Sequence, residues 1–244
     1  MIRSTEAIVL KTFDFRETSR IAVFYTKDYG KIKGVLKGIR ADPKKFGSNI
    51  DKFSVNDIVY YEYTRSDLHL VSQCDLKQFY FAIRQDYKRN VAANYILELV
   101  DTVMPQEHTN RKVYHLMLDY LSSLETTQDI DKMVHIFQIK ILLLSGFRPH
   151  IDACVQCRKK VEGKARFSLR AGGLVCSDCP STETDFTVIS KGTIASMLHI
   201  EKSDWPASLR LGLTQTVRKE LKYILNNFLV YHLGRKIRSA HFLV

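Results

Sequence analysis

The sequence predicts an α+β protein in which a small barrel of strands precedes a helical domain that a cysteine-rich module interrupts. Three observations lead to this prediction. The first 80 residues hold short segments rich in Val, Ile, Tyr and Phe, separated by turn residues. After Gln78, apolar residues recur every three to four positions, as they do on a helix. Two Cys-x-x-Cys pairs then follow within residues 150–182.

Five strands are expected in the first 80 residues, at 4–13, 19–26, 31–40, 56–64 and 68–76. The turns between them are expected at 27–30, around Pro43 and Gly47, and at 65–67. Five strands in so short a segment favour the five-stranded OB-fold barrel, which commonly binds single strands or oligosaccharides. An SH3-like barrel is the structural alternative.

Helices are expected from Tyr80 onward, where an apolar stripe continues to Leu99 and ends before Pro105. Further helices are expected at 112–124, 129–145, 190–199 and 209–237. Asp129 or Asp131 is placed to cap the helix at 129–145. The resulting domains are 1–79 for the OB-fold, 80–149 for the first helical part, 150–182 for the cysteine module and 183–244 for the second helical part.

The cysteine pairs predict one structural zinc ion bound by Cys154, Cys157, Cys176 and Cys179. Two Cys-x-x-Cys turns at this spacing are typical of a four-cysteine zinc site. Four thiolates complete the tetrahedron that zinc prefers and leave no position for a catalytic water. Two disulfides or four unrelated thiols are the alternatives. The N-terminus shows no secretory signal, however, and paired cysteines in a reducing compartment more often hold metal. The remaining Cys74 is interpreted as a small buried residue.

The charge pattern indicates a polyanionic partner. Lys and Arg number 37 against 26 Asp and Glu, and the net charge is +11. Residues 1–80 carry +4, residues 81–150 are neutral and residues 151–244 carry +7. Nucleic acid fits this segregation better than a membrane does, because no long basic amphipathic helix or lipidation motif is present. No segment approaches the roughly 18 apolar residues of a membrane span.

The segment 31–40 offers a candidate nucleic-acid surface. Because side chains alternate along a strand, Lys31, Lys33 and Lys37 are expected on the outer face, while Ile32 and Leu36 point into the barrel. This outer row can neutralise a phosphate backbone without reading bases. The row continues into the next loop through Arg40, Lys44 and Lys45. The alternative is that these lysines only solubilise a barrel edge.

Two further groups of side chains are secondary candidates. Tyr61 and Tyr63 can stack on bases, as aromatic residues do in OB-type single-strand sites, or can fill the barrel. A second basic cluster surrounds the cysteines and can contact DNA or simply face solvent: Arg158, Lys159, Lys160, Lys164, Arg166 and Arg170. The sequence lacks the P-loop, G-x-G-x-x-G, H-E-x-x-H, G-x-S-x-G and zinc-deaminase signatures. A binding protein without a catalytic residue is therefore expected rather than an enzyme.

The sequence resembles the RecO family of bacterial recombination mediators. The resemblance rests on SRIAVFYTKDYGKIKGVLKGIR, on FQIKILLLSGFRPHIDACVQC and on the Gly-Gly-Leu segment before the second cysteine pair. It implies a non-enzymatic DNA repair and recombination protein in the bacterial cytoplasm, associated with the nucleoid. It further implies binding of single- and double-stranded DNA and annealing of complementary strands.

The resemblance also implies partners and contact residues. With RecR, such a protein helps load RecA onto DNA coated by single-strand-binding protein, and it binds the C-terminal tail of that protein. The basic strand of the family matches Lys31, Lys33, Lys37 and Arg40, with Arg16 and Arg20 nearby by barrel topology. The remaining alternative is a zinc-ribbon and OB-fold factor that binds RNA or the ribosome.

Overall fold

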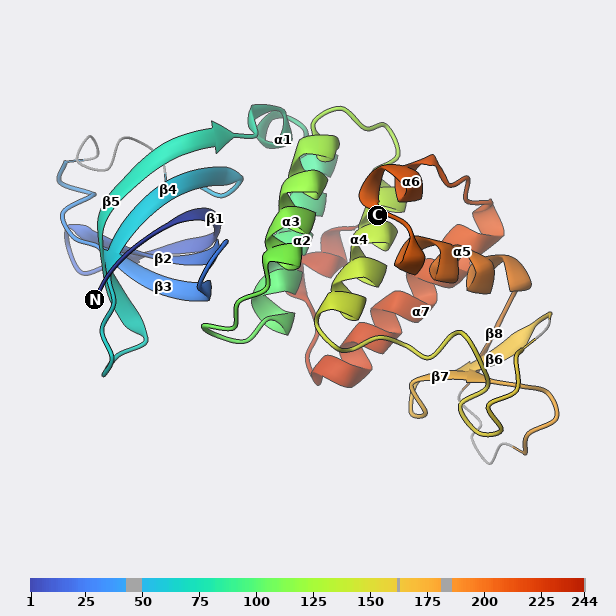
Figure 1. Cartoon of the computed structure of the whole chain (residues 1–244). Coiled ribbons are helices and arrows are strands. Elements are labelled where there is room, and N and C mark those ends of the chain that lie inside the picture. The colour runs from blue at the N-terminus through green and yellow to red at the C-terminus, as the bar shows by residue number, and fades with distance from the viewer. Residues whose placement is uncertain (43–49, 162, 181–185, 244) are drawn as a thin grey trace. The chain divides into compact units, whose positions relative to one another are not determined.

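The computed structural model describes residues 1–42, 50–161, 163–180 and 186–243 (Figure 1). The chain forms two compact units. The first contains residues 1–127 together with 239–244, and the second contains residues 128–238. In this division the first three helices group with the barrel. The four domain boundaries expected from the sequence concern a finer partition and remain predictions.

The first unit contains a closed barrel with the strand order β1-β2-β3-β5-β4. The strands are β1 (Ile2–Phe15), β2 (Ser19–Thr26), β3 (Gly30–Leu36), β4 (Ser54–Tyr61) and β5 (Leu68–Phe79). β4 also pairs with β1, so the sheet closes on itself, and only the β3–β5 pair is parallel. This is the five-stranded arrangement of an OB-fold. The predicted OB-fold barrel is therefore confirmed.

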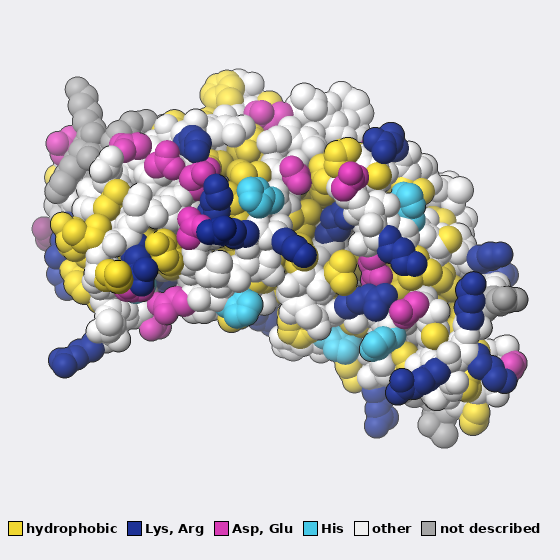
Figure 2. All heavy atoms as spheres, in the orientation of Figure 1, with side chains coloured by type: hydrophobic (Ala, Val, Ile, Leu, Met, Phe, Trp, Pro, Cys, Tyr) yellow, Lys and Arg dark blue, Asp and Glu magenta, His cyan; other side chains and the backbone are white. Residues whose placement is uncertain are grey.

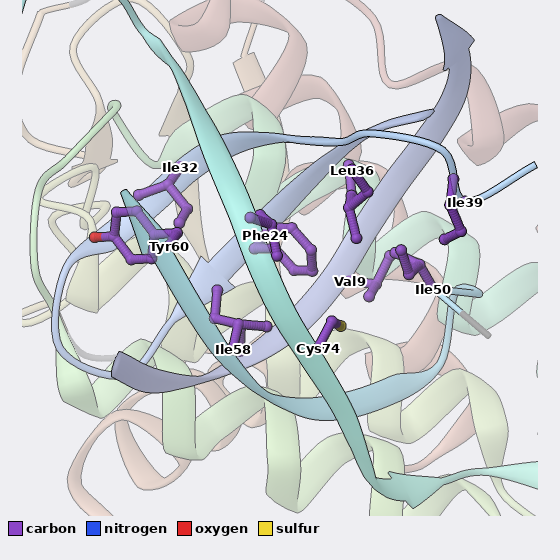
Figure 3. Close-up of a cluster of buried hydrophobic side chains, with 12 residues drawn as sticks. Val9, Phe24, Ile32, Leu36, Ile39, Ile50, Ile58, Tyr60 and Cys74 are labelled. Atoms are coloured by element: carbon purple, nitrogen blue, oxygen red, sulfur yellow. The ribbon is translucent and has the colours of Figure 1, made fainter. Parts of the chain in front are cut away.

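Buried apolar side chains fill the barrel (Figure 3). Ile32 and Leu36 point into this core beside Phe24 and Tyr60, as the alternation along the strand predicts. Cys74 also lies in the core and is 1% exposed, so its interpretation as a buried small residue is confirmed. Burial raises the pKa of its thiol to about 12. Gly34 lets β3 and β5 approach closely, because a Cβ atom there would lie 2.4 Å from Val71 Cγ2.

The predicted strand at 31–40 is too long. β3 ends at Leu36, and the chain then turns through Gly38, which has a positive φ of 79°. The Gly38 carbonyl oxygen accepts hydrogen bonds from the backbone N–H groups of Ala41 and Asp42 at 3.1 and 2.9 Å. Lys37 and Arg40 are consequently on a turn rather than on a strand.

The α-helices of the first unit are α1 (Phe81–Gln85), α2 (Tyr87–Val103) and α3 (Arg111–Leu124). A short 3-10 helix, η2, covers Arg238–Phe242. The stripe that predicted one helix from Tyr80 is thus split. Asp86 is extended, and its side chain accepts a hydrogen bond from the Arg89 backbone N–H, which begins a new helix there. Asn110 caps α3 in the same way, and α3 lies within one residue of its predicted bounds.

The helices of the second unit are α4 (Ile130–Leu144), α5 (Lys191–Lys202), α6 (Trp205–Arg210) and α7 (Gln215–Leu233). Asp129 caps α4 as predicted. The single helix predicted at 209–237 is wrong, because Thr214 is extended and caps a separate helix by accepting from the Val217 backbone N–H. No helix in the described part of the chain is long and apolar enough to cross a membrane.

A small antiparallel sheet of order β7-β6-β8 lies between α4 and α5 in the chain. Its strands are β6 (Ala165–Ser168), β7 (Gly173–Val175) and β8 (Phe186–Ile189). The predicted hairpin with a turn at Gly172 is confirmed by the pairing of β6 with β7. β8 is not among the predicted strands, because its four residues are too few to show an alternating pattern.

Candidate metal centre and nucleic-acid interface

The four paired cysteines meet at one point of the second unit. Their sulfur atoms all lie within 4.8 Å of one another. Cys154 Sγ lies 3.8 Å from Cys179 Sγ, and Cys157 Sγ lies 3.7 Å from Cys176 Sγ. A tetrahedral metal with bonds of about 2.3 Å to sulfur requires separations of about 3.8 Å, whereas a disulfide requires about 2.05 Å. The geometry fits a metal ion and excludes the disulfide alternative.

Backbone hydrogen bonds shape the first cysteine turn. The Arg158 backbone N–H donates to the Cys154 carbonyl oxygen at 2.9 Å, with Arg158 in the left-handed region at φ 61°. The Val155 N–H donates to the Leu174 carbonyl oxygen at 2.8 Å, which fixes this turn against β7. The Cys176 N–H in turn donates to Cys154 Sγ at 3.4 Å. These contacts bring the two cysteine pairs together although 18 residues separate them in the chain.

The protonation of the sulfurs also favours a cation at this centre. Burial raises the pKa of Cys154, but hydrogen bonds from the backbone N–H groups of Cys157, Cys176 and Gln156 outweigh this effect. The net result is a lowered pKa of about 6. Hydrogen bonding to the Cys176 and Cys157 sulfurs instead raises the pKa of Cys179 to about 12. One thiolate therefore forms readily, whereas a set of adjacent thiolates needs a bound cation to offset its negative charge.

Arg166 serves the cysteine centre itself. Its Nη2 atom donates to the carbonyl oxygens of Cys176 and Cys179 at 2.6 and 2.7 Å, and its guanidinium carbon lies 5.1 Å from the centre of the Phe186 ring. These contacts hold the second cysteine turn against β6. Since Nη2 already bonds two backbone carbonyl oxygens, Arg166 has a structural role in this module. Its contact with DNA remains a prediction.

The other members of that cluster are solvent-accessible. Figure 2 shows Lys and Arg side chains spread over this part of the second unit, with few carboxylates on the face in view. Exposed side chains belong to Arg158, Lys159, Lys160, Lys164 and Arg170. Their role in DNA contact remains a prediction.

The predicted cationic row on β3 does not form one continuous surface. Lys31 is only 7% exposed. Its Nζ atom donates to the Asp101 carbonyl oxygen of α2 at 2.5 Å and lies 3.3 Å from Asp101 Oδ1. Lys11 of β1 pairs with the same carboxylate at 2.7 Å. Lys31 thus fastens the barrel to α2, and its charge is not presented to a phosphate backbone.

The outer face of β2 and β3 is covered because helices and loops of the same unit pack there. Tyr25 is fully buried, and its hydroxyl donates to the Asn110 carbonyl oxygen at the start of α3. The Glu107 N–H donates to the Lys31 carbonyl oxygen at 3.0 Å. Lys33 is half-buried as a result. Strand alternation correctly assigned the outer face but could not show that helices cover it.

A second group of cations gathers at the turns that follow β1 and β3. Arg16, Lys37 and Arg40 are exposed there. The Arg40 backbone N–H donates to the Thr18 carbonyl oxygen at 2.9 Å, so the two turns meet. Arg20 is half-buried at the start of β2. We call Arg16, Arg20, Lys37 and Arg40 the basic end of the barrel.

Asp14 lies within the basic end and was missed by the sequence analysis. Its Oδ1 atom is 3.0 Å from Arg20 Nε, and its Oδ2 atom is 3.7 Å from Arg40 Nη1. The strand pairing of Asp14 with Arg20 could have been found only with the β1–β2 register in hand. Lys44 and Lys45, which the sequence analysis assigned to the same surface, lie outside the described residues.

The two tyrosines proposed for stacking are accessible. Tyr61 is 42% exposed and Tyr63 is 46% exposed, whereas Tyr60 lies in the barrel core. These exposures are compatible with stacking on bases, which remains a prediction.

A closed OB-fold barrel with a basic end, followed by helices and a cluster of four cysteines able to hold a metal ion, defines a class of OB-fold proteins suited to binding nucleic acid. Residues 1–80 match the family model described as Recombination protein O N terminal, and residues 84–241 match Recombination protein O C terminal. The chain belongs to the Recombination protein O family, which acts in DNA repair and recombination. The resemblance seen in the sequence is thereby confirmed.

Individual relatives agree with the family models. The chain is 28% identical to the DNA repair protein RecO of Moorella thermoacetica, over 98% of this chain and 89% of the relative. It is 29% identical to the DNA repair protein RecO of Desulfatibacillum aliphaticivorans, over 98% of this chain and 95% of the relative. The similarity therefore spans both units.

Proposed function

We propose that this protein is a non-enzymatic recombination mediator that binds single- and double-stranded DNA and anneals complementary strands. The observation that carries the proposal is the basic end, where Arg16, Lys37 and Arg40 are exposed on adjoining turns of an OB-fold barrel. OB-folds commonly bind nucleic acid through their loops and adjoining strands. Family membership in DNA repair supports DNA as the nucleic acid.

The proposed mechanism is electrostatic. Cations that neutralise phosphates release the ions condensed on the strand, so affinity falls as salt concentration rises. Neutralising two strands at once lowers the repulsion that opposes their pairing. The partners proposed from the family are RecR, the C-terminal tail of single-strand-binding protein and, indirectly, RecA. The proposed location is the bacterial cytoplasm, in association with the nucleoid.

For the metal centre we propose one structural zinc ion held by Cys154, Cys157, Cys176 and Cys179. Four cysteine sulfurs at these separations suit zinc and leave no open coordination position. When bound, zinc supplies a fixed cross-link between the two cysteine turns. The chain's own residues then position β6 and β7 around it.

The binding proposal is tested by replacing Arg16, Lys37 and Arg40 together with Ala. Affinity for single-stranded DNA should fall about equally for all sequences. The slope of log affinity against log salt should become shallower by about 2, because three phosphate contacts are lost. The matched control replaces three exposed lysines elsewhere, Lys88, Lys112 and Lys202. An unchanged slope in the first variant, or an equal change in the control, would exclude the basic end as the DNA surface.

Annealing separates the mediator from the alternative RNA-binding factor. Complementary DNA strands coated with single-strand-binding protein should anneal faster when the wild-type protein is added. A protein that preferred RNA and left coated DNA strands unpaired would instead be an RNA or ribosome-associated factor.

A further inference from the structure

The net positive charge of residues 151–244 lies mostly after Trp205, because acidic residues are scarce there. Residues 205–244 contain seven Lys and Arg and one acidic residue, Glu220, whereas residues 151–204 contain eight basic and seven acidic residues. The carboxylate of Glu220 is directed inward, since it accepts hydrogen bonds from the Ser190 backbone N–H and hydroxyl, both at 2.9 Å. Residues 205–244, which include α7, therefore carry +6 of the net charge of +7 that residues 151–244 hold.

One face of α7 is exposed along much of its length. The opposite face carries Leu221, Ile224 and Phe228, which are buried in the second unit. Lys219 and Lys222 are exposed near the start of the helix, and neither forms an ion pair with another described residue. Arg218 differs from them, because both of its terminal nitrogens bind the Asp129 carboxylate. The lysines thus remain as the accessible cations of this segment.

Large side chains with aromatic or apolar groups share the exposed face. Tyr223 is 57% exposed, Tyr231 is 52% exposed and Val230 is 38% exposed. Residues three, four or seven positions apart lie on one side of a helix, so Lys219, Tyr223 and Val230 form a stripe. The two tyrosines are eight residues apart, which separates them by about 12 Å along the axis and about 80° around it. Tyr231 therefore flanks the stripe on one side, and Lys222 flanks it on the other.

The Tyr231 ring packs against the ring of His232, the next residue of α7. Its centre lies 5.1 Å from that of His232, in an edge-to-face arrangement. The His232 ring lies 4.1 Å from the buried Phe228 ring and bonds the Leu169 carbonyl oxygen at 3.1 Å. A ring that is fixed before binding loses less conformational entropy when a partner packs on it.

We propose that the exposed face of α7, defined by Lys219, Lys222, Tyr223, Val230 and Tyr231, is a second surface for single-stranded DNA. The tyrosine rings stack on bases, and the two lysines, which precede both rings along the helix, pair with phosphates next to the base on Tyr223. This inference rests on the proposed function and adds a second site for single-stranded DNA to it. An electropositive track with stacking rings is the combination that binds single strands without sequence preference. A duplex would use the cations but would leave the rings without stacked bases.

The test uses the full-length protein with a fluorescein-labelled thymidine oligonucleotide and a matched strand of abasic residues. Replacing Tyr223 and Tyr231 with Ser should lower affinity for the thymidine strand about tenfold. The abasic strand, which cannot stack, should bind the variant as it binds the wild type. Replacing Lys219 and Lys222 with Gln should weaken binding of both strands and make the salt dependence shallower by about 1.4. Tyr87→Ser is the matched control, since Tyr87 is 68% exposed on α2.

Several results would overturn the proposal. Unchanged affinity in the tyrosine variant, or an equal loss for both strands, would remove the stacking role. A tyrosine variant that kept its DNA affinity but lost binding of an acidic, apolar peptide would make this face a protein-docking surface. If only the basic-end variant of the barrel lost DNA, the second site would be wrong while the proposed function stood. If the wild type bound no DNA, the proposed function itself would fail.

Photo-crosslinking keeps the test independent of variant folding. A strand carrying 5-iododeoxyuridine should crosslink the wild-type protein at Tyr223 or Tyr231, as mapped by mass spectrometry of peptides from α7. Crosslinks confined to the barrel would contradict the second site.

Discussion

The two ends of β3 carry lysines that the sequence treats alike and the structure treats differently. Lys31 at one end is buried and bound to Asp101 of α2. Lys37, just beyond the other end, is exposed on a turn beside Arg40. Strand alternation places both lysines on the outer side of the barrel. Helices cover that side at the Lys31 end, whereas it is exposed to solvent at the Lys37 end. A cationic row therefore indicates a binding surface only where no other element packs on it.

Replacing Lys31 with Met is expected to give the largest effect on stability. The change leaves Asp101 with Lys11 as its ion-pair partner and removes the charged link between β3 and α2. We expect the free energy of unfolding to fall by about 2 kcal/mol, below the range for fully buried pairs because Lys11 still compensates the carboxylate. Chemical denaturation measures it. The control, Lys37→Met, should change stability by less than about 0.5 kcal/mol.

For DNA binding we expect the opposite order, with a larger effect from Lys37→Met than from Lys31→Met. Lys31→Met should leave the salt slope of DNA binding unchanged once the protein is folded, whereas Lys37→Met should make it shallower. A stable Lys31→Met protein with weakened DNA binding would show that both ends of β3 face the strand.

The cysteine module offers a similar comparison, because Arg166 is half-buried and bonds the backbone while Arg170 is exposed. Replacing Arg166 with Gln removes a cationic donor from the Cys176 and Cys179 carbonyl oxygens. Residues that orient metal ligands typically contribute 10- to 100-fold to metal affinity. We expect a loss of about this size in competition with a zinc chelator. Arg170→Gln, the control, should retain metal like the wild type, and equal retention by both variants would deny Arg166 this role.

We expect low pH to destabilise the protein through Asp101, the ion-pair partner of Lys31. Burial raises the pKa of Asp101, but the nearby charges of Lys11 and Lys31 outweigh this effect. The net result is a pKa below the ordinary value of 3.8. A carboxyl whose pKa is lower in the folded state stabilises the fold above its unfolded pKa. That contribution is lost as pH falls through the folded pKa, so the loss begins below about pH 4. Thermal unfolding between pH 6 and pH 3 should show a smaller decrease in Tm for Asp101→Asn than for the wild type. An equal decrease would assign the acid sensitivity to other carboxylates.

Local patterns predicted the parts of this molecule that depend on neighbouring residues. The interior positions Ile32 and Leu36, the cap at Asp129 and the grouping of the four cysteines all follow from short-range periodicity or spacing. The burial of Lys31 could not be predicted this way, because Asp101 lies 70 residues further along the chain. The position of a charged side chain in the tertiary structure decides whether it stabilises the fold or remains available to a ligand.

The division of α6 from α7 shows the same limit on a smaller scale. The helix predicted at 209–237 includes residues 211–214, but Thr214 caps a new helix with its own side chain. A threonine can occupy either a helix interior or a cap, and the sequence pattern alone favoured the interior.

The smallest expected effect concerns Asp14, which offsets part of the charge of the basic end. Its carboxylate lies close to Arg20 and Arg40, so it competes with phosphate for both guanidinium groups. Asp14→Asn should raise affinity for single-stranded DNA about threefold at low salt, which is the scale of an exposed ion pair. The gain should fade at high salt as screening increases. Glu17→Gln, an exposed charge change on the same turn, is the control for net charge alone. Reduced affinity in Asp14→Asn would mean that the carboxylate instead orients Arg20 and Arg40 for binding. DNA binding at the basic end would then depend on ion pairs within the protein, just as the position of Lys31 depends on its ion pair with Asp101.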